Sequence, residues 1–157
     1  MYESVLIFSD THGAILPSRL LSLAEECDQI IFLGDGISGL GSLLCKSNLH
    51  AVAGNCDRVL PSFKREEVLE IAGARILITH GDRYRVKQDL TALYLRACEL
   101  NCKAALYGHT HASNLETHNG VLLLCPGSPC YPVGPAPTYA YMSIKDGEII
   151  ANIVPLY

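Results

Sequence analysis

Residues 4–12 read SVLIFSDTH, an unbroken apolar run from Ser4 to Phe8 that is followed at once by Asp10 and His12. A run without polar alternation is typical of a strand that is buried on both faces, as in a parallel sheet. In open α/β sheets, ligands bind beyond the carboxyl ends of the strands. The stretch therefore predicts a central strand that delivers an acid and a histidine to a functional edge.

Four further clusters of the same kind follow along the chain, each at the end of an apolar run. They are Gly34-Asp35, Gly54-Asn55-Cys56-Asp57, His80-Gly81 and Gly108-His109-Thr110-His111. Carboxylate oxygen, amide oxygen and imidazole nitrogen are ligands that suit divalent ions. Because ligands gather at the carboxyl ends of neighbouring strands, we expect the five clusters to converge on one point.

A pair of ions at this point would suit chemistry at phosphorus. Two ions about 3.5–4 Å apart clamp the attacking and leaving oxygens of a displacement, and they make a water molecule acidic enough to attack near neutral pH. Such a pair needs a bridging carboxylate. Asp35 is the candidate, because the glycines on either side of it let the backbone approach closely.

The rest of the chain alternates strands and helices at first and then changes to hairpins. After the first strand, the pattern predicts a helix over 17–27, a strand over 29–33, a short helix over 40–46 and a strand over 49–53. This βαβαβ order implies parallel strands. Later the pattern predicts hairpins over 67–79, 115–124 and 139–154, a long helix over 87–101 and a strand over 104–107. The fold class is therefore α/β, with two packed sheets flanked by helices.

Length and composition exclude several classes of protein. At 157 residues, the chain is long enough for one domain, 1–157, with a real core. Its net charge of −4 disfavours non-specific binding to a nucleic-acid polymer, which needs a basic face. No apolar run reaches the roughly 20 residues of a membrane-spanning helix, and the first residues lack the positive charge of a signal peptide.

Seven scattered cysteines without a CxxC spacing predict reduced thiols and a cytoplasmic protein. The same spacing disfavours a structural zinc site built from Cys98, Cys102, Cys125 and Cys130.

The ordered motifs D-x-H, G-D, G-N-x-D, H-G and G-H-T-H resemble those of the calcineurin-like metallophosphoesterase superfamily. The short chain and the variant third motif, with Cys56, are similar to its small prokaryotic phosphodiesterase branch, over about residues 4–150. The resemblance implies a four-layer α-β-β-α sandwich of two mixed sheets. It also implies a dinuclear centre with Asp10, His12, Asp35 and His111 at one ion and Asp35, Asn55, His80 and His109 at the other.

By the same resemblance, a metal-bridging hydroxide attacks a phosphodiester, and the catalytic roles fall on Asp35, Asn55 and His109. We expect two divalent ions, with Mn²⁺ first and Fe²⁺, Ni²⁺ or Zn²⁺ as alternatives, because affinity order does not choose among them. The expected partner is a small phosphoester substrate rather than a membrane or a nucleic-acid polymer. A homo-oligomer is left open.

Some positions depart from the family pattern or stand beside it. Many members have His where this chain has Cys56, and a thiol with a pKa of about 8.5 is a poor general acid. Asp57 and Asp82 are expected to orient ligand histidines from a second layer. Candidate substrate contacts are Cys56, Arg58 and Ser128, the last because it lies in a turn that resembles one near the family's metals.

Two other functions are weighed against hydrolysis. Residues 34–39, GDGISG, match the GxGxxG pattern of dinucleotide-binding folds, but the match follows the second strand and places the Asp35 carboxylate in the anion cradle. One eukaryotic branch of the superfamily keeps the fold as a catalytically silent scaffold subunit of a trafficking coat. All the expected ligands are present here, so we expect an enzyme.

Overall fold

The computed structural model of the chain describes residues 1–58 and 62–157 and contains two five-stranded sheets. The first sheet contains β1 (Tyr2–Phe8), β2 (Gln29–Phe32), β3 (Leu49–Ala51), β9 (Thr138–Lys145) and β10 (Glu148–Pro155). The second contains β4 (Glu66–Ile71), β5 (Ala74–Thr79), β6 (Ala104–Leu106), β7 (Asn114–His118) and β8 (Val121–Cys125).

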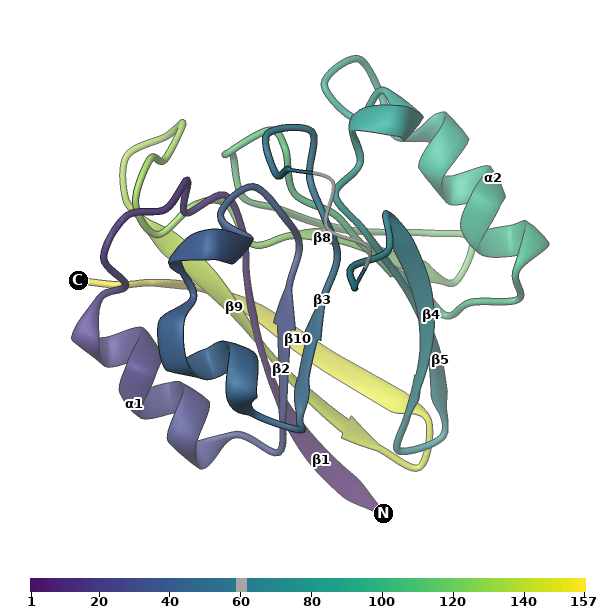
Figure 1. Cartoon of the computed structure of the whole chain (residues 1–157). Helices are drawn as coiled ribbons and strands as arrows, with labels where there is room; N and C mark the ends of the chain where they lie inside the picture. Colours follow the sequence, from purple (N-terminus) through teal and green to yellow (C-terminus); the bar gives the residue numbers. More distant parts are fainter. Residues whose placement is uncertain (59–61) are drawn as a thin grey trace.

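Both sheets mix parallel and antiparallel pairs, as expected. The strand order is β10-β9-β1-β2-β3 in the first sheet and β4-β5-β6-β8-β7 in the second. In the first sheet β1, β2 and β3 run parallel, and the β9–β10 hairpin adds two antiparallel strands on one side. In the second sheet β5, β6 and β8 run parallel, and β4 and β7 are antiparallel edge strands. Helix α1 (Ser18–Glu26) and helix α2 (Thr91–Glu99) lie on opposite sides of the molecule, so the layers are α-β-β-α (Figure 1).

Strand β1 shows why its sequence is apolar at every position. Val5 and Ile7 point into the core between the two sheets, whereas Leu6 and Phe8 point into the core under α1. All four side chains are fully buried. Side chains alternate between the faces of a strand, so a strand covered on both sides needs apolar residues throughout.

Two predicted helices differ from the structure in type or length. Residues 40–46 were expected to form a short α-helix but form 3₁₀ turns, η1 (Ile37–Gly39) and η2 (Gly41–Cys45). The long helix begins at Thr91 instead of residue 87 and ends at Glu99. Arg85 has φ +54°, which breaks the helix, and the Asp89 carboxylate accepts the Thr91 N–H at 3.0 Å in a local turn just before α2. Within the described residues, no helix has the length and apolar character needed to cross a membrane.

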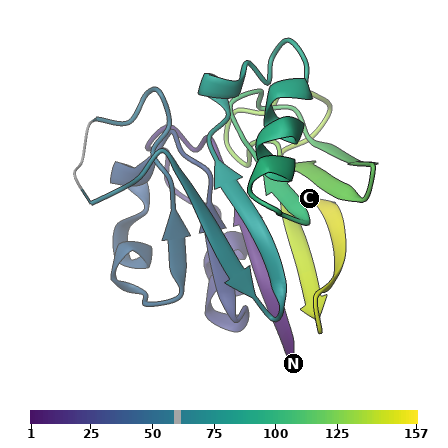
Figure 2. The ribbon, with the colours of Figure 1, turned by 90° about the vertical axis from the view of Figure 1, so that its right-hand side faces the viewer.

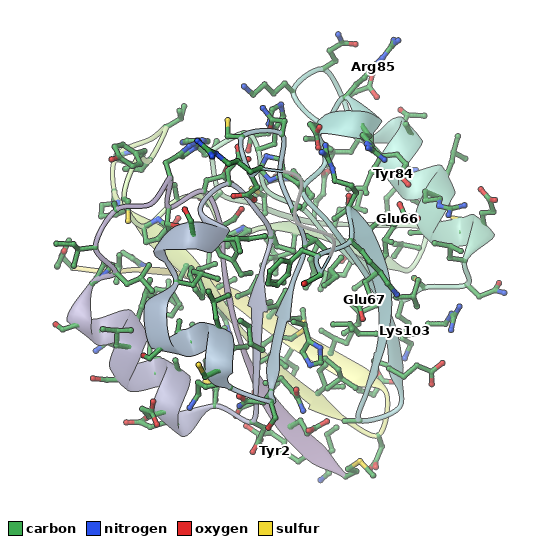
Figure 3. The ribbon with its side chains drawn as sticks, viewed as in Figure 1. Tyr2, Glu66, Glu67, Tyr84, Arg85 and Lys103 are labelled. Atoms are coloured by element: carbon green, nitrogen blue, oxygen red, sulfur yellow. The ribbon has the colours of Figure 1, made fainter. Side chains whose placement is uncertain are left out.

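Helix α2 is tied to the edge strand β4 by a polar contact. The Tyr84 hydroxyl, in η3 (Asp82–Tyr84), donates to the Glu66 carboxylate, and the two labelled residues face each other in Figure 3. Arg96 on α2 donates to Glu66 Oε2 from Nη2 at 2.8 Å and from Nε at 3.1 Å. The contact holds the segment after β5 against the outer face of the second sheet.

Two hairpin turns meet at one end of the sandwich. Ala72-Gly73 joins β4 to β5, Asp146-Gly147 joins β9 to β10, and both residues of each turn have φ between +46° and +84°. This is the conformation of two-residue turns that match the twist of a hairpin. The Gly147 N–H donates to the Ala72 carbonyl at 2.7 Å, and the two turns lie side by side in Figures 1 and 2. Because β9 runs antiparallel to β1, this end is opposite the carboxyl end of β1.

Candidate metal centre

The five clusters follow β1, β2, β3, β5 and β6, and their loops lie together at the upper end in Figure 1. Backbone hydrogen bonds join the loops to one another. The Asp10 N–H donates to the Gly34 carbonyl at 2.9 Å, and the His12 N–H donates to the Asp35 carbonyl at 2.8 Å. The Gly108 N–H donates to the His80 carbonyl at 2.9 Å, which fixes the loops of the second sheet in the same way.

Five of the expected ligands have left-handed backbone conformations. The φ angles are +60° at Asp10, +48° at His12, +60° at Asp35, +73° at His109 and +60° at His111. Side-chain-bearing residues rarely adopt this region, and each costs on the order of 1–3 kcal/mol. Such strain concentrates where a fold must aim side chains at a ligand.

Glycines let the loops approach one another within van der Waals distance. A Cβ on Gly34 would lie 2.7 Å from the Gly54 nitrogen and 2.8 Å from His80 Nδ1. A Cβ on Gly54 would overlap the Asp35 carboxylate, and one on Gly36 would overlap the Thr11 hydroxyl. We expected the glycines beside Asp35 to let the backbone of neighbouring loops approach closely. The short distances to a Cβ at Gly34 and Gly36 support this expectation.

The first ligand group consists of Asp10, His12 and His111, whose ligand atoms all lie within 4.8 Å of one another. Asp10 Oδ1 lies 3.3 Å from His111 Nε2 and 4.0 Å from His12 Nε2. The two Nε2 atoms are 3.2 Å apart.

Asp10 is fully buried, and its two carboxylate oxygens differ. Oδ2 accepts hydrogen bonds from the Ser9 hydroxyl at 2.5 Å and from the His109 N–H at 3.0 Å. Oδ1 has no hydrogen-bond partner among the described residues. A buried carboxylate oxygen without a partner is costly unless a cation lies beside it. The arrangement fits a divalent ion between Asp10 Oδ1 and the two imidazoles.

The second ligand group consists of Asp35, His80 and His109, again within 4.8 Å of one another. His80 Nε2 lies 3.1 Å from Asp35 Oδ2 and 3.2 Å from His109 Nδ1. Asp35 Oδ2 also lies 3.9 Å from His12 Nε2, so this carboxylate stands between the two groups. Its position is the one that a bridging ligand requires.

Charges within the second group perturb one another. Burial raises the pKa of the Asp35 carboxyl, but the hydrogen bond and charge of His80, together with the Cys56 N–H, outweigh burial and lower it to about 2. Burial lowers the pKa of His80, but the carboxylates of Asp35 and Asp10 more than offset this and raise it. Burial and the charge of His80 lower the pKa of His109. The Asp35 carboxylate is therefore stabilised in its charged form by the groups beside it.

The structure brings the six expected carboxylate and imidazole ligands together. The seventh, Asn55, lies in an exposed loop, where its amide nitrogen is 3.6 Å from Cys56 Sγ. The six come from both sheets: Asp10, His12 and Asp35 follow strands of the first, whereas His80, His109 and His111 follow strands of the second.

Backbone carbonyls orient two of the imidazoles. His80 Nδ1 lies 2.7 Å from the Leu33 carbonyl, and His111 Nδ1 lies 2.7 Å from the Tyr131 carbonyl. Each contact fixes the ring and leaves Nε2 available as a ligand. Sequence reasoning missed these partners, because every residue carries a backbone carbonyl and residue type gives no signal for it.

Asp57 and Asp82 were expected to orient histidines, and their hydrogen bonds in the structure go to other partners. Asp57 accepts backbone N–H groups from Asp35, Gly36, Ile37 and Gly54 at 2.8–3.1 Å, so it shapes the two loops themselves. Asp82 forms an ion pair with Arg65 at 2.6 Å. Short carboxylates at loop starts reach backbone donors and a neighbouring guanidinium before they reach an imidazole.

The contacts of Asp57 also contradict a dinucleotide site at residues 34–39. The N–H groups that would cradle a pyrophosphate are the ones that bind Asp57, and the segment continues as a 3₁₀ turn instead of an α-helix.

Of the candidate substrate contacts, Ser128 is occupied by contacts within the protein. It is fully buried, donates to the Asp10 carbonyl at 2.9 Å and accepts the Tyr131 N–H at 2.8 Å, so it holds the first motif in place. Cys56 and Arg58 are exposed, and both line a cavity of about 500 Å³ beside the ligands.

The four cysteines weighed for a structural zinc site are Cys98, Cys102, Cys125 and Cys130. They are free thiols and do not belong to any ligand group among the described residues.

Known proteins share both this sequence pattern and this fold. A family model for the calcineurin-like phosphoesterase superfamily domain matches residues 4–147. The probable metallophosphoesterase YsnB of Bacillus subtilis is 36% identical over 149 residues, which cover 91% of this chain and 85% of that protein.

Three solved structures are similar in fold at lower identity. A predicted phosphoesterase of Streptococcus pneumoniae TIGR4 has a TM-score of 0.85 at 24% identity, and the match covers 99% of this chain and 90% of that protein. Vps29 of Entamoeba histolytica complexed with Zn²⁺ has a TM-score of 0.79 at 23% identity, and the match covers 98% of this chain and 99% of that protein. An archaeal phosphodiesterase has a TM-score of 0.74 at 20% identity, and the match covers 96% of this chain and 99% of that protein.

The family model spans nearly all of this chain, and one relative is 36% identical to it. The chain therefore belongs to the calcineurin-like phosphoesterase superfamily.

Proposed function

We propose that the protein is a hydrolase that cleaves phosphodiester bonds with two divalent ions held at the ends of its strands. One observation carries the proposal: six ligand side chains from two sheets converge at one point. Two details of that site agree with it. Asp35 lies between the two ligand groups, and the buried Asp10 Oδ1 has no hydrogen-bond partner among the described residues. The geometry supports a role as bridging ligand for Asp35. Asn55 and His109 complete the ligand set that we expect from the family resemblance.

The chain's own residues hold the ligand side chains in place, and the ligands determine where the ions and a substrate phosphate would lie. Asp10 is held through Oδ2 by Ser9 and the His109 N–H, and its carbonyl is held by Ser128. His80 and His111 are held through Nδ1 by backbone carbonyls. When bound, the ions would polarise phosphoryl oxygens and make water acidic enough to attack. Only two carboxylates face the ions, so the loaded site keeps a positive charge that favours an anionic ester.

The side chain at position 56 bears on the kind of ester. Burial, followed by the charge of Asp35, raises the pKa of the Cys56 thiol, so the thiol is a poorer acid than a histidine at neutral pH. Leaving groups would then depart without a proton from this position. We therefore propose small diesters with good leaving groups as the best substrates, and Mn²⁺ as the first ion to test, with Fe²⁺, Ni²⁺ and Zn²⁺ beside it.

The test is hydrolysis of a chromogenic phosphodiester and of the matching monoester by metal-stripped protein. Mn²⁺, Mg²⁺, Zn²⁺ or nothing is added back, and Asp35→Asn prepared in the same way controls for a contaminating enzyme. We expect diester turnover that returns only with metal and exceeds monoester turnover. Metal binding without turnover of either ester would contradict hydrolysis and favour a scaffold role instead.

A further inference from the structure

We propose that Cys56 is itself a metal ligand, which with His12 and Asp35 forms a soft position that prefers Zn²⁺ or Co²⁺ to Mn²⁺. The inference deepens the proposed function and rests on it, because the ion concerned is one that Asp35 holds. It differs from the ligand set implied by the family motifs, in which position 56 is not a ligand.

The three donor atoms already face one another. Cys56 Sγ, a nitrogen of His12 and a carboxylate oxygen of Asp35 lie within 4.8 Å of one another. The Cys56 N–H donates to Asp35 Oδ1 at 2.8 Å, which fixes the cysteine beside the carboxylate. The same three residues line a cavity of about 150 Å³, which is enough for an ion and a few water molecules.

The position of Cys56 distinguishes it from the chain's other thiols. Cys102 and Cys125 are buried in the core under α2, and Cys27 is buried in the core under α1. Cys45 and Cys98 are exposed on helical turns. Among the described residues, only Cys56 shares a ligand group with a histidine and a carboxylate.

The chemistry of the donors sets the preference. A thiolate is a soft ligand that suits zinc and cobalt, whereas Mn²⁺ favours carboxylate, carbonyl and water oxygens. Coordination would replace the S–H bond by a sulfur–metal bond, and the proton would leave to solvent. The Asn55 amide nitrogen, 3.6 Å from Sγ, can donate to the sulfur and leaves the Asn55 carbonyl oxygen available to an ion. A thiol at this position then changes which ion the site selects.

The experiment loads metal-stripped full-length protein with Co²⁺ and records its absorption spectrum. Sulfur–cobalt bonding gives a charge-transfer band in the near ultraviolet, whereas Co²⁺ held by any ligands gives weaker bands in the visible. We expect both in the wild type, loss of the ultraviolet band alone in Cys56→Ser, and both bands in Cys98→Ser as the matched control. By competition with a chelator, Cys56→Ser should raise the Kd for Zn²⁺ roughly tenfold or more and that for Mn²⁺ less than about threefold.

A second measurement uses the wild-type protein alone, so it stands if Cys56→Ser does not fold. Zn²⁺ should protect Cys56 from alkylation while Cys98 stays reactive, as read by mass spectrometry. Visible Co²⁺ bands without the ultraviolet band, or alkylation of Cys56 at an unchanged rate, would overturn the role of Cys56 and leave the proposed hydrolase standing. Absence of any Co²⁺ binding would instead overturn the metal centre.

Discussion

Asp35 is the residue on which the proposed centre depends, because its carboxylate lies between the two ligand groups. One oxygen accepts the Cys56 N–H, and the other lies 3.1 Å from His80 Nε2 and 3.9 Å from His12 Nε2. An amide at this position keeps the shape but loses the charge that holds two cations close together.

Asp35→Asn should therefore lower metal-dependent turnover by at least about 100-fold, with the circular dichroism spectrum unchanged. The matched control is Asp146→Asn, which makes the same change at an exposed left-handed position in the turn at the far end of the molecule. Comparable activity in the two variants would count against a bridging role.

A second change at the scale of one residue concerns Cys56. If proton donation to the leaving group limits the rate, Cys56→His should raise kcat/KM roughly tenfold or more on diesters with poor leaving groups. For diesters with good leaving groups, kcat/KM should rise little. The ratio of kcat/KM on the two kinds of diester, compared between the variant and the wild type, measures the effect. An unchanged ratio would argue that position 56 plays no acid role.

Residue types predicted the ligands better than they predicted what surrounds the ligands. Asp, His and Gly in ordered motifs identified the convergent side chains, because only certain side chains bind metals. The orienting groups are carbonyls of Leu33 and Tyr131, which no pattern of side chains marks. The partners of Asp57 and Asp82 were not predicted for a related reason: a carboxylate binds backbone N–H groups and guanidinium groups as readily as it binds histidines.

At the scale of elements, hairpins were predicted well and helical segments less well. Asn119-Gly120 and Asp146-Gly147 are turn sequences whose positive φ angles determine the pairing of the strands beside them. The segment before α2 looked helical because its apolar residues recur at helical spacing. It stays irregular because Arg85 adopts a left-handed conformation and the Asp89 carboxylate binds the Thr91 N–H in a local turn. Such bonds between a side chain and the nearby backbone compete with the helix, and the spacing of apolar residues does not indicate them.

The contact that ties α2 to β4 gives a prediction for alkaline pH. Burial and the hydrogen bond to Glu66 raise the pKa of Tyr84 to about 12, above its ordinary value of 10.0. A raised pKa in the folded state contributes stability below pH 10 that is lost as the pH rises toward 12. The free energy of unfolding should fall by about 1 kcal/mol more over this window in the wild type than in Tyr84→Phe, after allowance for solvent screening. Chemical denaturation measures the free energy of unfolding at each pH. The same dependence on pH from 10 to 12 in the wild type and in Tyr84→Phe would contradict the prediction.

For the molecule as a whole, the ligands connect the two sheets. Asp10, His12 and Asp35 belong to loops of the first sheet, and three histidines belong to loops of the second. An ion bound by both sets stabilises the folded chain by mass action, which amounts to about 2.7 kcal/mol at 100 times the Kd.

Addition of metal to stripped protein should therefore raise the Tm by about 5–10 °C for a chain of this size. Thermal unfolding with Mn²⁺ or Zn²⁺, followed by excess chelator, measures the shift and its reversal. Asp35→Asn should show a much smaller shift. An equal shift in that variant would place the stabilising ion elsewhere on the protein.

The contact between the turns Ala72-Gly73 and Asp146-Gly147 has a consequence for motion. The Gly147 N–H bonds the Ala72 carbonyl, and Lys103 Nζ bonds the Gly147 carbonyl at 2.7 Å, so one end of the sandwich is joined without any ion. At the ligand end, hydrogen bonds from the His109 N–H to Asp10 and between His80 and the Leu33 carbonyl also join the sheets, and a bound ion would add to them. Removal of the ions should therefore loosen the ligand end more than the end with the two turns, and amide hydrogen exchange should quicken most in the loops farthest from these turns.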